Sequence, residues 1–300
     1  RMDIDGGKKT TMQVLKIALH RPWILLFREP IVFLCSFYLA VIYGILYMLF
    51  DAYPIVFQEV RGWSEGKGGL AFLGVLVGMT MAFFYILFDN MRYARLCAET
   101  IGRVSPERRL HVVILGSISL PVGLFWFAWT NSPSIHWMSS IAAGAPFGFG
   151  MVLVFLGISN YLVDSYVIYA ASVMAASSAT RAIFGAIFPL FTTYMYEGLG
   201  IHWASCIPAF LSLACVPCPL LFYFYGPRIR ARCHFSAEAN RYMEHLMAKH
   251  NVELQQFPDE RNPEELLAIT DAENQAANRG DDMPPPTPTS FAFTSNATTP

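Results

Sequence analysis

The chain has 300 residues, of which 54% are hydrophobic, 15% aromatic and only 14% charged, and its formal net charge is −1. Soluble domains carry about 25% charged residues, so a water-soluble protein of this composition could not cover its surface. No basic stretch is interleaved with exposed aromatic residues, which argues against nucleic acid as a partner.

Six apolar runs follow one another along the chain, and each is long enough to cross about 30 Å of hydrocarbon with about 20 residues. The only charged residues inside them are Asp51 and Arg181. Buried helices of soluble proteins seldom reach this length, so the pattern predicts an all-α membrane protein with a six-helix transmembrane bundle. The runs cover residues 31–57, 69–88, 110–130, 137–159, 166–196 and 201–226.

The remaining segments suggest a simple domain organisation. Residues 1–30 form a basic linker that ends in a pre-span helix, and residues 31–226 form the six-span unit. Residues 227–280 are polar and helix-prone, which is typical of a cytoplasmic tail. Residues 281–300 are rich in Pro, Thr and Ser, so we expect them to be disordered.

Basic residues alternate between the connections of the six runs. Fourteen Lys and Arg residues fall on one predicted side of the membrane, and only Arg61 and Lys67 fall on the other. The positive-inside rule therefore places both termini in the cytoplasm, as an even number of spans also requires. The basic side comprises 1–30, 89–109 and 227–233, and the other side comprises 58–68, 131–136 and 197–200.

The sequence contains no catalytic motif. Phosphate-binding loops, nucleophile elbows and His/Cys groups with zinc spacing are all missing, so we expect no enzyme activity, no cofactor and no metal. Cys215 and Cys218 have the spacing of a redox motif. Their neighbours are Val, Pro and Leu in an apolar run, and this favours inert packing.

Arg181 is the most informative residue of the sequence. It lies midway between Tyr166 and Tyr196 with no other charge between them, so a helix across this run places it near the bilayer centre. A charge there is costly and usually functional. Asp51 lies about 15 Å away in depth and Asp164 about 25 Å, at 1.5 Å per residue. Arg181 must therefore face water, a carbonyl group, a substrate or a partner outside this chain.

Other candidates for substrate binding or coupling are weaker. Asp51, at the outer end of the first run, is either an interfacial aspartate or a proton-titratable group at the mouth of a cavity. Tyr43, Tyr47 and Phe147 could line an apolar cavity for an amphipathic ligand, although each could equally serve in packing.

Several stretches resemble fungal transporters of the major facilitator superfamily, namely the drug:proton antiporter family with twelve spans, near the polyamine and multidrug exporters. The similarity extends over about residues 15–232 in family order. The stretches include RPWILLFREPIVFLCSFYLAVIYGILYMLFDAYPIVF, RGWSEGKGGLAFLGVLVGM, PERRL, GLFWFAWT, HWMSSIAAGAPFGFGMVLVFLGISNYLVDSYVIYAASVMAA, RAIFGAIFPLFTTYMYEGLGIHWAS and IPAFLSLACVP.

The resemblance implies that the six runs are spans seven to twelve, which form one half of a major facilitator superfamily fold. DNMRYARL lies where the family carries a cytoplasmic basic motif, so Asp89, Arg92 and Arg95 are its candidate residues. The resemblance also implies a plasma-membrane location and an N-terminal half, or a second chain, as a partner. Arg181 would then meet a gating contact across the seam between the halves.

Two functions remain open at this point. The first is proton-coupled export of polyamines, drugs or other amphipathic small molecules, as half of a twelve-span transporter in the lipid bilayer. The second is a truncated or regulatory half-transporter without transport activity of its own. Six further spans encoded directly upstream would favour the first, and a native start codon before residue 1 would favour the second.

The predicted orientation can be tested by cysteine labelling. A cysteine at Ser64 should react with a membrane-impermeant reagent from outside intact cells, because Ser64 lies in the sparsely charged connection. A cysteine at Ser105, in the basic connection, should react only after the cells are permeabilised. The opposite pattern would reverse the topology.

Overall fold

The structure is a computed structural model that describes residues 11–99, 106–233, 235, 238–239 and 241–242. The chain divides into two compact units, Arg1–Glu244 and His245–Pro300, and every described residue belongs to the first unit. The expected disordered segment 281–300, most of the expected tail 227–280, and Ser105 of the labelling test lie outside the described residues.

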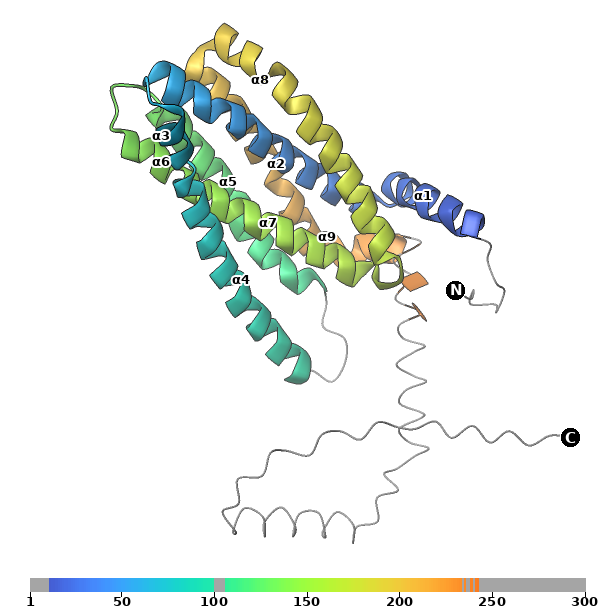
Figure 1. Cartoon of the computed structure of the whole chain (residues 1–300). Helices are drawn as coiled ribbons and strands as arrows, with labels where there is room; N and C mark the ends of the chain where they lie inside the picture. The colour runs from blue at the N-terminus through green and yellow to red at the C-terminus, as the bar shows by residue number, and fades with distance from the viewer. Residues whose placement is uncertain (1–10, 100–105, 234, 236–237, 240, 243–300) are drawn as a thin grey trace, which may run out of the picture. The chain divides into compact units, whose positions relative to one another are not determined.

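Within the described part of the chain all regular structure is helical (Figure 1). This confirms the expected all-α fold. Short 3₁₀ or π-helical turns cover Ile55–Val60, Pro106–Arg109 and Val167–Tyr169. The α-helices are α1 (Thr11–Arg28), α2 (Pro30–Pro54), α3 (Glu65–Leu70), α4 (Leu73–Glu99), α5 (Leu110–Thr130), α6 (Trp137–Ala142), α7 (Gly144–Ser165), α8 (Ala170–Cys215) and α9 (Pro217–Arg232).

Five helical segments are long and apolar enough to cross a membrane, and the fifth, Val167–Arg230, has 64 residues. This is about three times the length that one span needs. The segment is interrupted at Gly200, whose φ of 73° and ψ of 165° are not helical. In Figure 1 the chain reverses near the far end of α8 and returns toward α9. The two arms of this segment complete the predicted six-helix bundle.

A hydrogen bond across the reversal supports the division of this segment into two arms. The hydroxyl groups of Tyr196 and Ser205 are 2.9 Å apart. Nine residues would separate them by about 13 Å along a straight helix, so the contact forms because the chain turns back between them. Asn131, directly after α5, also contacts the returning arm, since its amide donates to Ser205 Oγ at 3.1 Å.

Polar contacts tie the connections together at both ends of the bundle. At one end, Arg61 donates to the carbonyl oxygens of Ser132 (2.7 Å) and Ile135 (3.0 Å), and burial lowers the pKa of its guanidinium. At the other end, Arg109 binds Asp164 at 2.6 Å. We call this second end the basic end. It comprises residues 28–30, 89–95, 106–111, 164–169 and 228–233.

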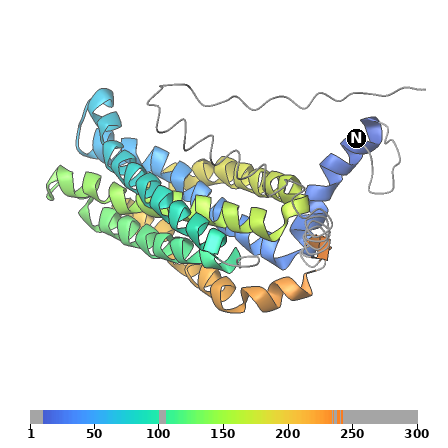
Figure 2. The same ribbon diagram turned by 90° about the horizontal axis from the view of Figure 1, so that it is seen from below.

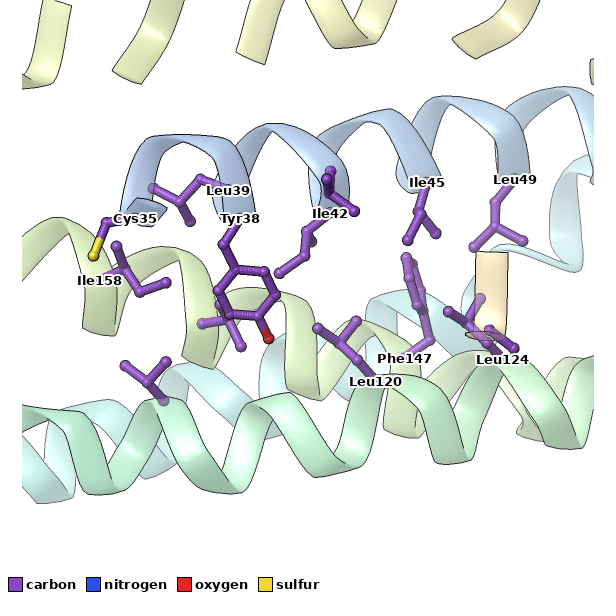
Figure 3. Packing of buried hydrophobic residues seen from close by; sticks show 14 of the residues in the cluster. Cys35, Tyr38, Leu39, Ile42, Ile45, Leu49, Leu120, Leu124, Phe147 and Ile158 are labelled. Atoms are coloured by element: carbon purple, nitrogen blue, oxygen red, sulfur yellow. The ribbon is translucent and has the colours of Figure 1, made fainter. Parts of the chain in front are cut away.

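The core lies between α2, α5 and α7 and consists of aliphatic and aromatic side chains. Figure 3 shows Tyr38, Ile42 and Ile45 of α2 pointing toward Leu120 of α5 and Phe147 of α7. Figure 2 shows the long helices running alongside one another, with α1 at the same end of the bundle as the end of α9.

Close helix packing depends on small residues spaced four apart, as in GVLVG (residues 74–78) and GAPFG (residues 144–148). A Cβ atom at Gly78 of α4 would overlap the carbonyl group of Ala145, and one at Gly148 of α7 would overlap the carbonyl group of Val75. These positions let α4 and α7 pack backbone against backbone, as membrane helices commonly do.

Replacing Gly200 tests the reversal. An L-residue is strained at its positive φ by about 1–2 kcal/mol, so Gly200→Ala should lower the apparent melting temperature of the chain in detergent. Gly198→Ala is the matched control, because Gly198 lies in the helix and a Cβ atom there would meet nothing within 4 Å. Equal melting temperatures for the two variants would contradict a tight turn at Gly200.

Candidate functional site

The site candidates of α2 form one polar stripe. Tyr43, Tyr47 and Asp51 are four residues apart, which places them on one face of the helix. All three are half-buried. The hydroxyl groups of Tyr43 and Tyr47 lie 3.3 Å apart, and their ring centroids lie 5.0 Å apart. The stripe therefore runs from the C-terminal end of α2 toward its middle.

Arg181 of α8 lies beside Tyr43, at the end of this stripe near the middle of α2. Its guanidinium carbon is 6.0 Å from the ring centroid of Tyr43 and 4.6 Å from that of Phe155 on α7. Nη2 donates a hydrogen bond to Ser178 Oγ at 2.9 Å. A guanidinium over an aromatic face gains about 0.5–1 kcal/mol where it stays exposed, and this offsets part of the cost of a charge in the membrane.

Two glycines bring α2 and α8 together at this point. A Cβ atom at Gly185 would lie 3.1 Å from Tyr43 Cε1 and 3.4 Å from Tyr47 Cδ2. A Cβ atom at Gly44 would lie 2.8 Å from the ring of Phe188. The tyrosine rings occupy the space that a larger residue at position 185 would take, so Gly185 sets their position beside Arg181.

No carboxylate pairs with Arg181 among the described residues. Asp164 binds Arg109 at the basic end, and Asp51 makes no hydrogen bond or ion pair with any described residue. Only one of the five N–H groups of Arg181 has an acceptor within the described chain. The site, which we call the Arg181 cluster (Arg181, Ser178, Tyr43, Tyr47 and Phe155), is therefore a half-buried cation on aromatic rings. It has the capacity to bind an anionic or polar acceptor.

The other candidates lie elsewhere. Phe147 is 2% exposed and packs in the core between α2 and α5, apart from the Arg181 cluster. Asp89 binds His111 at 2.9 Å at the basic end. Arg92 and Arg95 are exposed on the last turns of α4. The structure thus brings together Arg181, Tyr43 and Tyr47, with Asp51 farther along the stripe.

Sequence reasoning missed Phe155 and the contacts of the basic end. Glu29, only 1% exposed, accepts hydrogen bonds from the Tyr166 hydroxyl (2.7 Å) and the Phe235 backbone N–H (2.9 Å). Burial and this bond to Glu29 raise the pKa of Tyr166. Arg230 lies 3.4 Å from Glu107. These partners are more than 100 residues apart, so no spacing in the sequence could reveal them.

The described residues contain no group of three His, Cys, Asp or Glu side chains that could hold a metal ion. Around Arg181, the side chains offer a charge, a hydrogen-bonded hydroxyl group and aromatic rings.

Comparison with known proteins agrees with the helical membrane fold. The Major Facilitator Superfamily profile matches residues 5–189. The MFS-type efflux pump MFS2 of Trichophyton rubrum is 62% identical over 255 residues, which are 85% of this chain and 43% of that pump. No solved structure matches the chain.

Two further relatives are similar over the same extent. The major facilitator superfamily multidrug transporter mdrA of Aspergillus fumigatus is 62% identical over 246 residues, or 82% of this chain and 40% of that protein. The efflux pump FUB11 of Gibberella moniliformis is 53% identical over 249 residues, which are 83% of this chain and 42% of that pump. The chain spans about two fifths of the length of these curated relatives. Its helical bundle and the profile match together show that the chain belongs to the Major Facilitator Superfamily.

Proposed function

We propose that this chain is the six-span C-terminal half of a twelve-span exporter that moves amphipathic small molecules out of the cell in exchange for protons. The names of its relatives, efflux pump and multidrug transporter, support export. The share of their length that the chain covers supports its assignment as one half. The remaining six spans, on the same or another chain, complete the transporter in this proposal.

The Arg181 cluster is the observation that carries the proposal. In transporters built from repeats, substrates bind near the bilayer midplane between the repeats. Arg181, Tyr43 and Phe155 lie near the middle of their helices, and each remains partly exposed in the six-span unit. A half-buried cation with free donors fits a face that meets substrate or a second half. It does not fit a face that meets lipid.

The chemistry of the cluster favours some substrates over others. Aromatic rings suit planar or apolar groups, and the guanidinium suits a carboxylate, phenolate or carbonyl oxygen. A polyamine would meet a like charge at Arg181, so drugs and other amphipathic molecules fit this face better than polyamines.

Proton coupling needs a carboxylate whose protonation changes with access to water. Asp51 is the one acid on the polar stripe, about 12 Å along α2 from Tyr43 at 1.5 Å per residue. We assign it as the coupling candidate of this half. The basic end then faces the cytoplasm of a fungal plasma membrane, in accordance with the positive-inside rule.

Substitution of Arg181 in an intact exporter that carries the equivalent arginine tests this function. Arg181→Ala should reduce drug export about tenfold to hundredfold at unchanged membrane abundance, because a charged hydrogen bond is worth about 1.5–3 kcal/mol. Arg181→Lys should also fail, since it keeps the charge but loses the planar fork of donors.

Ile183→Ala is the matched control on the same helix, because Ile183 is 46% exposed and its place two residues after Arg181 puts it on another face of α8. It should export normally. Export by Arg181→Ala at the level of Ile183→Ala would show that the cluster is packing and not a functional site.

A further inference from the structure

A second concave surface lies at the basic end, between the start of α2 and α9. It is a hollow of about 1030 Å³. Its wall is apolar and includes Leu34 of α2 and Leu221 and Phe222 of α9, whereas Arg28 and Arg228 lie on its lining at the end of the bundle. The hollow therefore changes from apolar to cationic along the helix axes.

The charges of this hollow are not balanced within the described chain. Arg28 and Arg228 are exposed, and neither forms an ion pair with a described residue. The one acid of the lining, Glu29, has each oxygen engaged, one by the Tyr166 hydroxyl and the other by the Phe235 N–H. Two guanidinium groups thus remain available to a ligand beside one buried carboxylate.

Such a gradient fits an amphiphile with an anionic head. Two arginines can bind phosphate oxygens through paired N–H donors. The apolar wall formed by Leu34, Leu221 and Phe222 can cover an acyl chain. Basic pockets between membrane helices on the cytoplasmic side bind lipid headgroups of this kind.

Helix α1 gives an independent indication of membrane contact at the same place. Its side chains Met12, Leu19, Trp23 and Phe27 are 43–73% exposed, and their spacing of seven, four and four residues puts them on one face. Lys16 is exposed on this same face, four residues after Met12, and its long side chain can extend to the lipid headgroups. An exposed apolar face that carries a Trp and a Lys is typical of a helix that lies in the headgroup region. Arg28, which ends α1, links this face to the hollow.

We propose that the hollow between α2 and α9 binds an anionic phospholipid, whose phosphate is held by Arg28 and Arg228 while α1 lies on the membrane surface beside it. The bound lipid would contact both the start of α2 and α9, which are the first and last helices of the six-span unit. This site is separate from the Arg181 cluster, so it does not depend on the proposed transport function.

The test uses the full chain purified in mild detergent, with lipid binding measured by native mass spectrometry. Phosphatidylserine should be retained about tenfold or more over phosphatidylcholine, in keeping with the attraction of two basic side chains for an anionic lipid. The double substitution Arg28→Gln/Arg228→Gln should abolish that preference. Arg92→Gln/Arg95→Gln, which removes two exposed arginines at the same end, is the matched control and should keep it.

Two further measurements complete the test. Competition with inorganic phosphate distinguishes a lipid site from a site for simple anions, and a conservative Lys variant distinguishes loss of binding from loss of folding. Inorganic phosphate should not displace phosphatidylserine, because it leaves the apolar wall uncovered. If phosphate displaces it, the hollow is a free-anion site. The Arg28→Lys/Arg228→Lys variant should fold and retain part of the preference. Equal retention of the two lipids by the wild-type chain, or loss of preference in the α4 control, would overturn the proposal.

Discussion

A charge in hydrocarbon must find a partner or reach water, and this constraint explains where the polar residues of the bundle lie. At the basic end Arg109 pairs with Asp164, and Arg230 lies beside Glu107. At the opposite end Arg61 is held by backbone carbonyl groups. Arg181 is the exception near the middle, where aromatic rings and one hydroxyl group replace a counter-ion.

The exception becomes understandable if the polar stripe of α2 and the cluster on α8 face another part of the transporter. Gly44 and Gly185 allow the two helices to approach, and the approach places Tyr43 beside the guanidinium. The result is a preformed, half-buried cation at the surface of the six-span unit. In a twelve-span protein the same surface would line the space between two halves.

Hydropathy and charge were enough to predict the helical class, the six crossings and an arginine without a carboxylate at its own depth. They work because spans have a fixed length and intramembrane charges are rare. Contacts between helices were not predictable from one sequence. Phe155 and the Glu29–Tyr166 pair depend on which helix faces meet. Phe147 illustrates the same limit, since an aromatic residue in a span can face a cavity or the core, and here it lies in the core.

Water access beside Arg181 is the most direct measurement of the central claim, that this face lines an aqueous cavity. Ser178, exposed and bonded to Arg181, and Ile118 of α5, 51% exposed, are both uncovered in the six-span unit. In the intact transporter Ser178→Cys should react with a water-soluble thiol reagent, and substrate should slow the reaction. Ile118→Cys, at an exposed apolar position of α5 away from the polar stripe, is the control that should not react. Equal lack of reaction at both positions would contradict the account.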